Sequence, residues 1–428
     1  MVPMRAHRRT SLRRRVLPLY VAVALQGVML WVPVEKLFMS EIGFDAASVG
    51  LMAAAYAAVV PIIEIPSGIL ADRWSRRGVL VVATVALMLC SLIGGLSDNV
   101  TTYIASALVL GVYFAMYSGT MDAIVYDTVL EETGGSETFE KRIGRVRFVE
   151  SITLVSSSLV GGWLAGLTST RLMYFLTVPF AALSIVAYLR FAEPTLHRSE
   201  ARTSLRSHVS VTFQTITRRG RLLPIVALAV LTSLILQVIF EFGPLWLVAL
   251  AASAVLYGPY WAGLVSTLGL GGLIAGRLRF DRPATLGGVV GLMILSSLVL
   301  TVSRSILVVT LAHVVLAMLV VAASIHVTRL LHDAVPSTIR SGVASGVSAV
   351  SWMAFLPFAL VFGLVSKQIG VHMAGWMITV VTVLAGALLA KVALGHRPGP
   401  ADDDATATAV EPVPATASAC VTGAAVAA

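Results

Sequence analysis

Carboxyl side chains occur inside several long apolar stretches of this 428-residue chain, where a charged group is costly and is therefore a candidate for function. In the stretch 100–130, Asp122 shares a helical face with Ser118 and Tyr126, at spacings of four residues. Both hydroxyls can hydrogen-bond the carboxyl between them, and a carboxyl so placed can take up and release a proton. The candidates for carrying a proton are, in order, Asp122, Glu241 and Glu64.

More charges lie at the polar ends of neighbouring apolar stretches. Arg147 and Glu150 can pair at i, i+3 on one helix. A structural interpretation competes with the chemical one, because these charges can form an ion network that holds one conformation shut. Asp122 and Glu64 fit either role. The expected network consists of Asp127, Arg145, Arg147 and Glu150.

Polar and aromatic side chains deeper in the apolar stretches are candidates for lining a cavity. Gln237 lies on one face with Glu241, at i, i+4. His313 fits either a proton relay or a hydrogen-bonded packing residue. Glu35 and Lys36, near the end of the first apolar stretch, are expected to form an ion pair at the outer membrane surface. The cavity candidates are Gln26, Trp31, Tyr117, Gln237 and His313.

The elements that carry these residues are membrane-spanning helices. Hydrophobic residues make up 57% of the chain and charged residues 12%, and the mean hydropathy is +0.89. A spanning helix needs about 20 apolar residues, which predicts an all-α membrane protein of about twelve transmembrane helices. The expected spans are 16–38, 47–71, 78–97, 100–130, 146–168, 171–191, 222–249, 255–277, 284–302, 305–330, 339–365 and 371–394.

Basic residues predict the orientation. Most arginines between the apolar stretches fall in alternate loops, whereas the opposite side holds only Lys36, Arg171, Arg304 and Lys367. Because basic loops remain cytoplasmic, both termini are expected in the cytoplasm, in a multi-pass protein of the cell membrane. The expected divisions are a basic N-terminus 1–15, a six-helix half 16–191, a cytoplasmic linker 192–221, a second six-helix half 222–394 and a disordered tail 395–428.

A charged loop follows the second predicted helix. Asp72 at the helix C-terminus faces the negative end of the helix dipole and needs a cation or another helix N-terminus nearby. Arg73, Arg76 and Arg77 supply cations within one turn, and Gly68 lets a neighbouring backbone come close. These residues predict a conformational latch at the membrane surface.

The segment 64–77, which reads EIPSGILADRWSRR, resembles the signature loop between helices 2 and 3 of the major facilitator superfamily of secondary transporters. Ser75 departs from the motif, because a glycine is usual at this place. A weak internal echo supports two repeated halves, since GILADR at 68–73 returns as GLIAGR at 272–277.

The resemblance implies two pseudo-symmetric six-helix halves that rock about a central cavity lined by helices 1, 4, 7 and 10. It also implies that Asp72 faces the start of helix 11, at 337–342. Two features depart from the drug/proton antiporters of the family. The helix 5 segment 156–162 keeps only the final Gly-Gly of their motif, and helix 4 lacks their intramembrane arginine.

These features favour a monomeric secondary transporter whose partners are protons, the lipid bilayer and a small, fairly apolar molecule that it exports. The arginines form no continuous face, which argues against a nucleic-acid partner. The chain has no H-E-x-x-H, G-x-S-x-G or P-loop motif, so no enzymatic activity, metal or cofactor is expected. The alternatives are a proton-coupled importer or uniporter of a polar solute, and a membrane sensor without transport.

Overall fold

The computed structural model describes residues 4–133, 139–194, 222–335 and 340–395, although a few side chains within these ranges, including those of Asp72 and Ser118, are not described. The described residues form helices joined by short turns. The helices are α1 (Met4–Gln26), η1 (Val32–Val34), α2 (Glu35–Glu41), α3 (Ala46–Arg73), α4 (Arg76–Leu96), α5 (Val100–Thr133), α6 (Phe139–Leu167), α7 (Thr170–Arg190), α9 (Leu223–Phe242), α10 (Pro244–Ala249), α11 (Ala254–Ala275), α12 (Pro283–Val302), α13 (Ile306–Asp333), α14 (Arg340–Ile369) and α15 (Val371–Gly395). Most of the predicted linker and almost all of the predicted tail lie outside the described residues.

Ten helices in the described part of the chain are long and apolar enough to cross a membrane. The predicted all-α membrane fold is therefore confirmed. The other two predicted spans correspond to α1, whose apolar part Arg15–Gln26 is short, and to α11, which does not reach the same hydropathy. α1 begins at Met4, so the described part of the basic N-terminal stretch continues the first helix.

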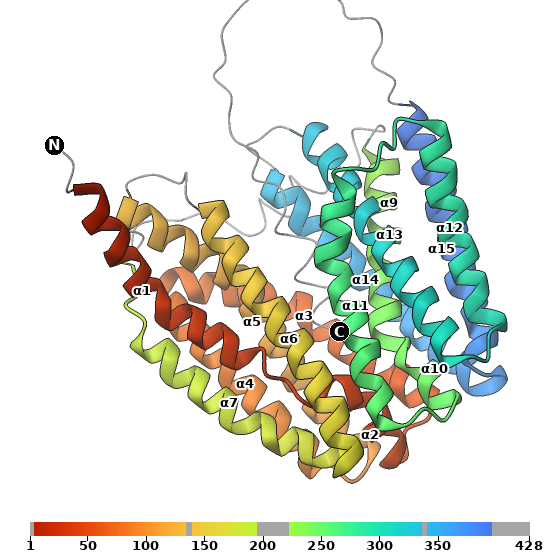
Figure 1. The fold of residues 1–428 in the computed structure, drawn as a ribbon, viewed down its shortest axis with the longest axis horizontal. Coiled ribbons are helices and arrows are strands. Elements are labelled where there is room, and N and C mark those ends of the chain that lie inside the picture. Colours follow the sequence, from red (N-terminus) through yellow and green to blue (C-terminus); the bar gives the residue numbers. More distant parts are fainter. Residues whose placement is uncertain (1–3, 134–138, 195–221, 336–339, 396–428) are drawn as a thin grey trace, which may run out of the picture.

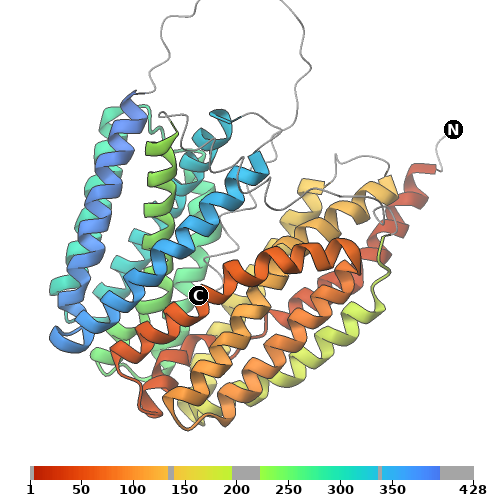
Figure 2. The ribbon, with the colours of Figure 1, turned by 180° about the vertical axis from the view of Figure 1, so that it is seen from behind.

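The helices form two groups. α1 and α3 to α7 pack against one another, and α9 and α11 to α15 do the same. The two groups lie close together at one end of the molecule and diverge toward the end that carries the N-terminus (Figure 1). They meet along two seams, α3 against α14 (Figure 2) and α6 against α11.

Glycines allow the backbones to approach at both seams. A Cβ atom added to Gly50 on α3 would lie 2.5 Å from the carbonyl oxygen of Ala359 on α14, close to Gly363. A Cβ added to Gly162 on α6 would lie 2.5 Å from the backbone nitrogen of Gly258 on α11. Small residues at such crossings are typical of helix contacts in membranes.

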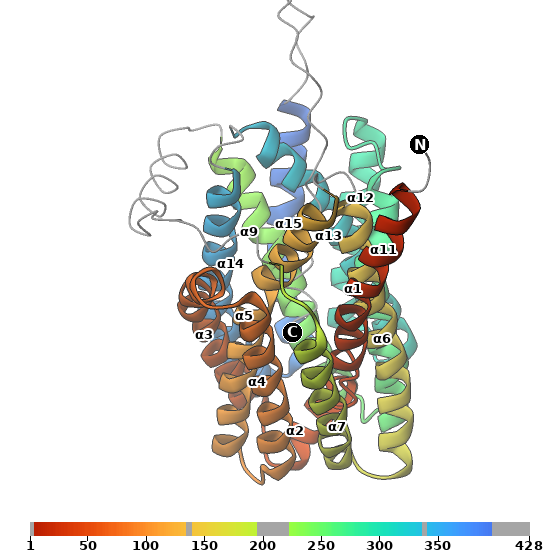
Figure 3. The same ribbon diagram turned by 90° about the vertical axis from the view of Figure 1, so that its left-hand side faces the viewer.

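One predicted helix in each group is interrupted. The expected span 16–38 is broken after Gln26, and the chain continues through a turn and η1 into α2. Pro33 in this segment cannot donate a backbone hydrogen bond, and the Leu30 nitrogen donates to the Thr177 hydroxyl oxygen at 3.1 Å. Gly243 and Pro244 divide the expected span 222–249 into α9 and α10. α2 packs against both α10 and α7, and lies at the end of the molecule where α7 begins (Figure 3).

Candidate functional site

Three charged side chains meet between the two helix groups. The Lys36 ammonium donates to Glu35 Oε2 at 2.8 Å and to Glu241 Oε1 at 2.5 Å. The Lys36 side chain is 1% exposed and that of Glu241 4%. Lys36 lies on α2, which follows α1 along the chain and packs against α7 of the first group, and Glu241 lies on α9 of the second group, so this bridge joins the two groups inside the protein.

The predicted ion pair of Glu35 and Lys36 is present, but it is buried and does not lie at the surface as expected. That expectation assumed one continuous helix from 16 to 38. Because the helix breaks after Gln26, α2 packs against α10 of the other group instead of extending outward. Discontinuous helices of this kind commonly form binding sites in transporters.

Hydroxyl groups fix the second carboxylate of the cluster. Tyr103 on α5 donates to Glu35 Oε1 at 2.9 Å, and its oxygen lies 2.7 Å from that of Tyr174 on α7. The Trp31 ring stacks on Tyr174, with 5.2 Å between the ring centroids. The charged cluster is therefore held by three elements of the first group and by α9 of the second.

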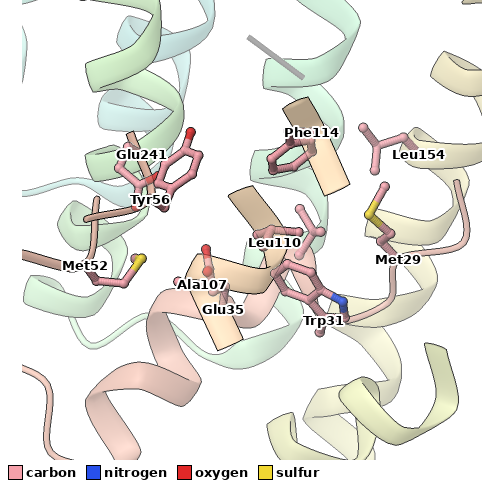
Figure 4. A pocket seen from close by; sticks show the side chains of 11 residues that line it. Met29, Trp31, Glu35, Met52, Tyr56, Ala107, Leu110, Phe114, Leu154 and Glu241 are labelled. Atoms are coloured by element: carbon pink, nitrogen blue, oxygen red, sulfur yellow. The ribbon is translucent and has the colours of Figure 1, made fainter. Parts of the chain in front are cut away.

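A small cavity lies beside these charges. Its walls are mostly apolar and aromatic, and the two carboxylates supply the charge. Figure 4 shows Tyr56 beside Glu241 on one side, and Trp31 beneath Met29 on the other. The lining residues are Met29, Trp31, Val32, Glu35, Met52, Tyr56, Ala107, Leu110, Phe114, Leu154 and Glu241. A largely apolar pocket with few polar groups is the usual form of a small-molecule site.

Two polar atoms in the cavity wall have no hydrogen-bond partner among the described residues. They are the Tyr56 hydroxyl and the Trp31 indole Nε1, on side chains that are each 3% exposed. Buried polar groups are normally paired, because an unpaired one costs about 1–3 kcal/mol. Both atoms are therefore buried without a partner in this conformation.

Asp122 lies in a different cluster, within the first group of helices. Arg147 donates to Asp122 Oδ1 at 2.8 Å and to Glu150 Oε2 at 3.1 Å, and the Tyr117 hydroxyl donates to Glu150. The predicted Arg147–Glu150 pair is thus present. Arg147 reaches Asp122 because α6 packs against α5. The side chain of Ser118, one of the two expected hydroxyl partners, is not described.

The signature loop is held by hydrogen bonds to the end of the first helix group. Ser75 is the N-cap of α4, and its oxygen accepts from the Gly78 nitrogen at 2.8 Å. Glu193 accepts from the Ser75 hydroxyl and from the Arg76 nitrogen, both at 2.6 Å. Arg77 donates to the Phe191 carbonyl oxygen at 3.1 Å. The departure at Ser75 therefore supplies a helix cap.

Other latch and network residues differ in their surroundings. Arg76 pairs with Asp127, whereas Arg145 and Arg73 are exposed. A Cβ added to Gly68 would meet nothing within 4 Å, so the close backbone approach expected there is not made in this conformation. α3 contacts α14 near Gly50, five turns earlier, and the two groups diverge from there. The side chain of Asp72, residues 337–339 and the side chains of residues 340–342 are not described, and neither is the contact expected between them.

Most of the cavity candidates lie elsewhere. Gln26 is buried and accepts from the Tyr188 hydroxyl at 2.6 Å, and Tyr117 bonds Glu150. His313 is packed edge-on against Trp246, and Gln237 is buried. Glu64 is half-buried, with no cation of the described residues in ion-pair distance. Of the five candidates, Trp31 lines the cavity.

Sequence reasoning missed Lys36, Glu35 and Tyr56 as site residues. One signal was present, because Pro33 and the Gly243-Pro244 pair interrupt the first and seventh predicted spans. Interruptions at matching places in two halves mark binding sites in transporters. The aromatic and apolar wall residues carried no comparable signal.

A comparison with protein families decides the class of the protein. The model of the Major Facilitator Superfamily matches residues 16–353. The chain belongs to this superfamily. It is therefore a multi-pass membrane protein of a family of secondary transporters, whose members bind small-molecule substrates in the membrane and are not enzymes.

Curated relatives are distant. Multidrug resistance protein 2 of Bacillus subtilis (strain 168) is 27% identical over 189 residues, which cover 44% of this chain and 45% of that protein. Multidrug resistance protein 1 of the same organism is 25% identical over 173 residues, which cover 40% and 43%. The chain thus spans less than half the length of these two relatives.

Solved structures resemble the fold over most of the chain. The nucleoside transporter NupG gives a TM-score of 0.72 at 13% identity, covering 88% of this chain and 98% of that one. A bacterial homologue of the human lysosomal transporter Spinster, inward-facing and occupied, gives 0.71 at 14% identity, covering 94% and 100%. At such identities the likeness shows the fold alone.

Proposed function

We propose that this superfamily transporter exports small, largely apolar molecules in exchange for protons. The cavity wall supports this proposal, because it consists mainly of methionine, leucine and aromatic side chains. The names of the two distant Bacillus relatives point the same way.

The observation that carries the proposal is the bridge between Lys36 and Glu241. Glu241 lines the cavity and at the same time links the two helix groups. Its protonation removes the charge that attracts Lys36, which loosens the link between the groups. Proton binding at one carboxylate thereby acts on both the cavity and the relative position of the groups.

Glu241 takes precedence over Asp122 as the coupling carboxylate. Asp122 is paired with Arg147 inside a single group, and it is not among the residues that line the cavity. Its pair with Arg147 fits the structural interpretation, an ion network that stabilises one conformation. Glu64 remains a third candidate.

The proposed cycle is alternating access between two halves, 16–191 and 222–394, with both termini in the cytoplasm of a cell whose membrane the protein spans. In this assignment the diverging end of the molecule faces the cytoplasm. The latch of Gly68, Asp72, Arg73, Arg76 and Arg77 then closes that end in the opposite conformation.

The test is flux of a fluorescent lipophilic dye into or out of proteoliposomes under an imposed pH gradient. Glu241→Gln should reduce pH-driven flux by at least about tenfold, because the neutral side chain cannot exchange a proton. Asp122→Asn should retain it. If Asp122→Asn loses pH-driven flux and Glu241→Gln retains it, Asp122 is the coupling carboxylate. If the dye moves across the membrane in the same direction as the protons, the protein is an importer and not an exporter.

A further inference from the structure

We infer that Lys36 is a built-in counterion that sets the charge class of the substrate, so that the site accepts molecules with one positive charge and excludes those with two. This inference rests on the proposed transport function, because it concerns the same cavity. It assigns a specificity role to a residue that no motif marks.

The charged groups beside the cavity do not balance. Two carboxylates, Glu35 and Glu241, face one ammonium, Lys36. Among the described residues no second cation lies within ion-pair distance of these carboxylates. Arg171 on α7 donates to Asp98 and lies over the Phe38 ring, 5.4 Å from its centroid. The cluster therefore lacks one positive charge.

The other titratable groups around the cluster do not change this count. Tyr56 on α3 lines the same cavity, and Tyr103 on α5 and Tyr174 on α7 form the hydroxyl network at Glu35. These phenols are neutral in the physiological range. His313 on α13 packs against Trp246 and Tyr260, away from the carboxylates.

The second step is the cost of a charge out of water. A buried carboxylate without a counterion is strongly unfavourable, so the missing charge is supplied either by a proton or by a substrate cation. One monocation completes the balance when it displaces one proton. A dication leaves one positive charge in excess, in a cavity whose walls are apolar. Lys36 already supplies one of the two positive charges that balance the two carboxylates, so a second charge on the substrate has no partner.

The third step is the fit of the remaining wall. The Tyr56 and Trp31 rings line the cavity and can stack on a flat cation. The expected substrate is therefore a largely apolar, preferably aromatic, molecule with a single positive charge.

The experiment compares ethidium, a monocation, with propidium, which has the same ring system and a second cationic group. Binding to purified protein in detergent is followed by fluorescence, so no flux is needed. The wild type should prefer ethidium by at least about tenfold, and Lys36→Gln should shift that ratio toward propidium by at least about tenfold. Lys36→Arg should keep the wild-type ratio.

Lys391→Gln is the matched control, because it removes the charge of an exposed lysine on α15 and should leave the ratio unchanged. A second readout uses the wild type alone. Ethidium binding at mildly acid pH should release about one proton per molecule, as measured by calorimetry in buffers of different ionisation enthalpy.

The inference is overturned if Lys36→Gln keeps the wild-type ratio, if wild-type binding releases no proton, or if the wild type binds neither dye. If the protein binds the dyes with the expected charge selectivity but shows no pH-driven flux, the proposed proton coupling is contradicted. The inference about Lys36 is then retained.

Discussion

At the scale of residues, Arg147 is the cation that two acidic side chains share. Its guanidinium bonds both Asp122 and Glu150, with one quarter of the side chain exposed. Loss of such a cation leaves two carboxylates close together without compensation, although solvent screens part of the effect.

Arg147→Gln should therefore lower the stability of the protein by about 1–2 kcal/mol. Thermal unfolding of the purified protein in detergent measures the change. Arg145→Gln, two residues away on the same helix and exposed, is the control and should have little effect. Equal destabilisation by the two variants would show that the pairs of Arg147 contribute nothing specific.

From the sequence, the acidic member of each ion pair was easier to identify than its basic partner. Glu241 and Asp122 were found because a carboxyl in an apolar stretch is conspicuous. Their partners follow from packing. Lys36 reaches Glu241 across 205 positions of the chain, and Arg147 reaches Asp122 across 25. The Arg147–Glu150 pair, at i, i+3, and the Glu35–Lys36 pair of adjacent residues depend on local geometry that the sequence contains.

At the scale of elements, close contacts between helices depend on the absence of side chains. α3 and α14 meet where Gly50 and Gly363 leave room for backbone contact. A methyl group at Gly50 would overlap the Ala359 carbonyl oxygen, so the helices must separate or the chain must shift.

Gly50→Ala should thus destabilise the protein by about 1–3 kcal/mol in thermal unfolding. Gly288→Ala on α12 is the control, since a Cβ there meets nothing within 4 Å and alanine favours the helix. The seam is not tightly packed at this point if both variants unfold at the wild-type temperature.

Helix existence was predictable from hydropathy, whereas helix interruption was not. The stretch 16–38 is apolar throughout its central part, and Pro33 alone does not show where the chain turns. The turn depends on partners in other helices, such as the Thr177 hydroxyl and the space that Gly161 leaves for the Leu30 carbonyl. These contacts decide where Glu35 and Lys36 lie.

At the scale of the whole molecule, the two helix groups are also joined by an exposed ion pair. Lys367 at the end of α14 donates to Asp45, the N-cap of α3, at 2.8 Å. The hydrogen bond from Lys367, followed by that from the Ser48 backbone, lowers the pKa of Asp45 to about 2. A lowered pKa means that the pair is fully present above the ordinary Asp value of about 3.9 and is lost as the pH falls toward about 2.

Between about pH 5 and 8 this pair should therefore stay intact, and it should not contribute to proton coupling. Spin labels at the ends of α3 and α14 in lipid nanodiscs measure the separation. Lys367→Gln should lengthen or broaden the distance distribution, more weakly at high salt, and Lys367→Arg should not. A Lys367→Gln distribution identical to that of the wild type would contradict the assignment.

The anchoring of Phe191, Ala192 and Glu193 has a mechanical consequence. These residues are tied to the loop before α4 and to Arg15 of α1, so the chain leaves the first helix group from a fixed point. A force on the chain beyond Glu193 should therefore act on these hydrogen bonds before it reaches α7. If the proposed halves move relative to each other, the end of α7 should therefore stay intact.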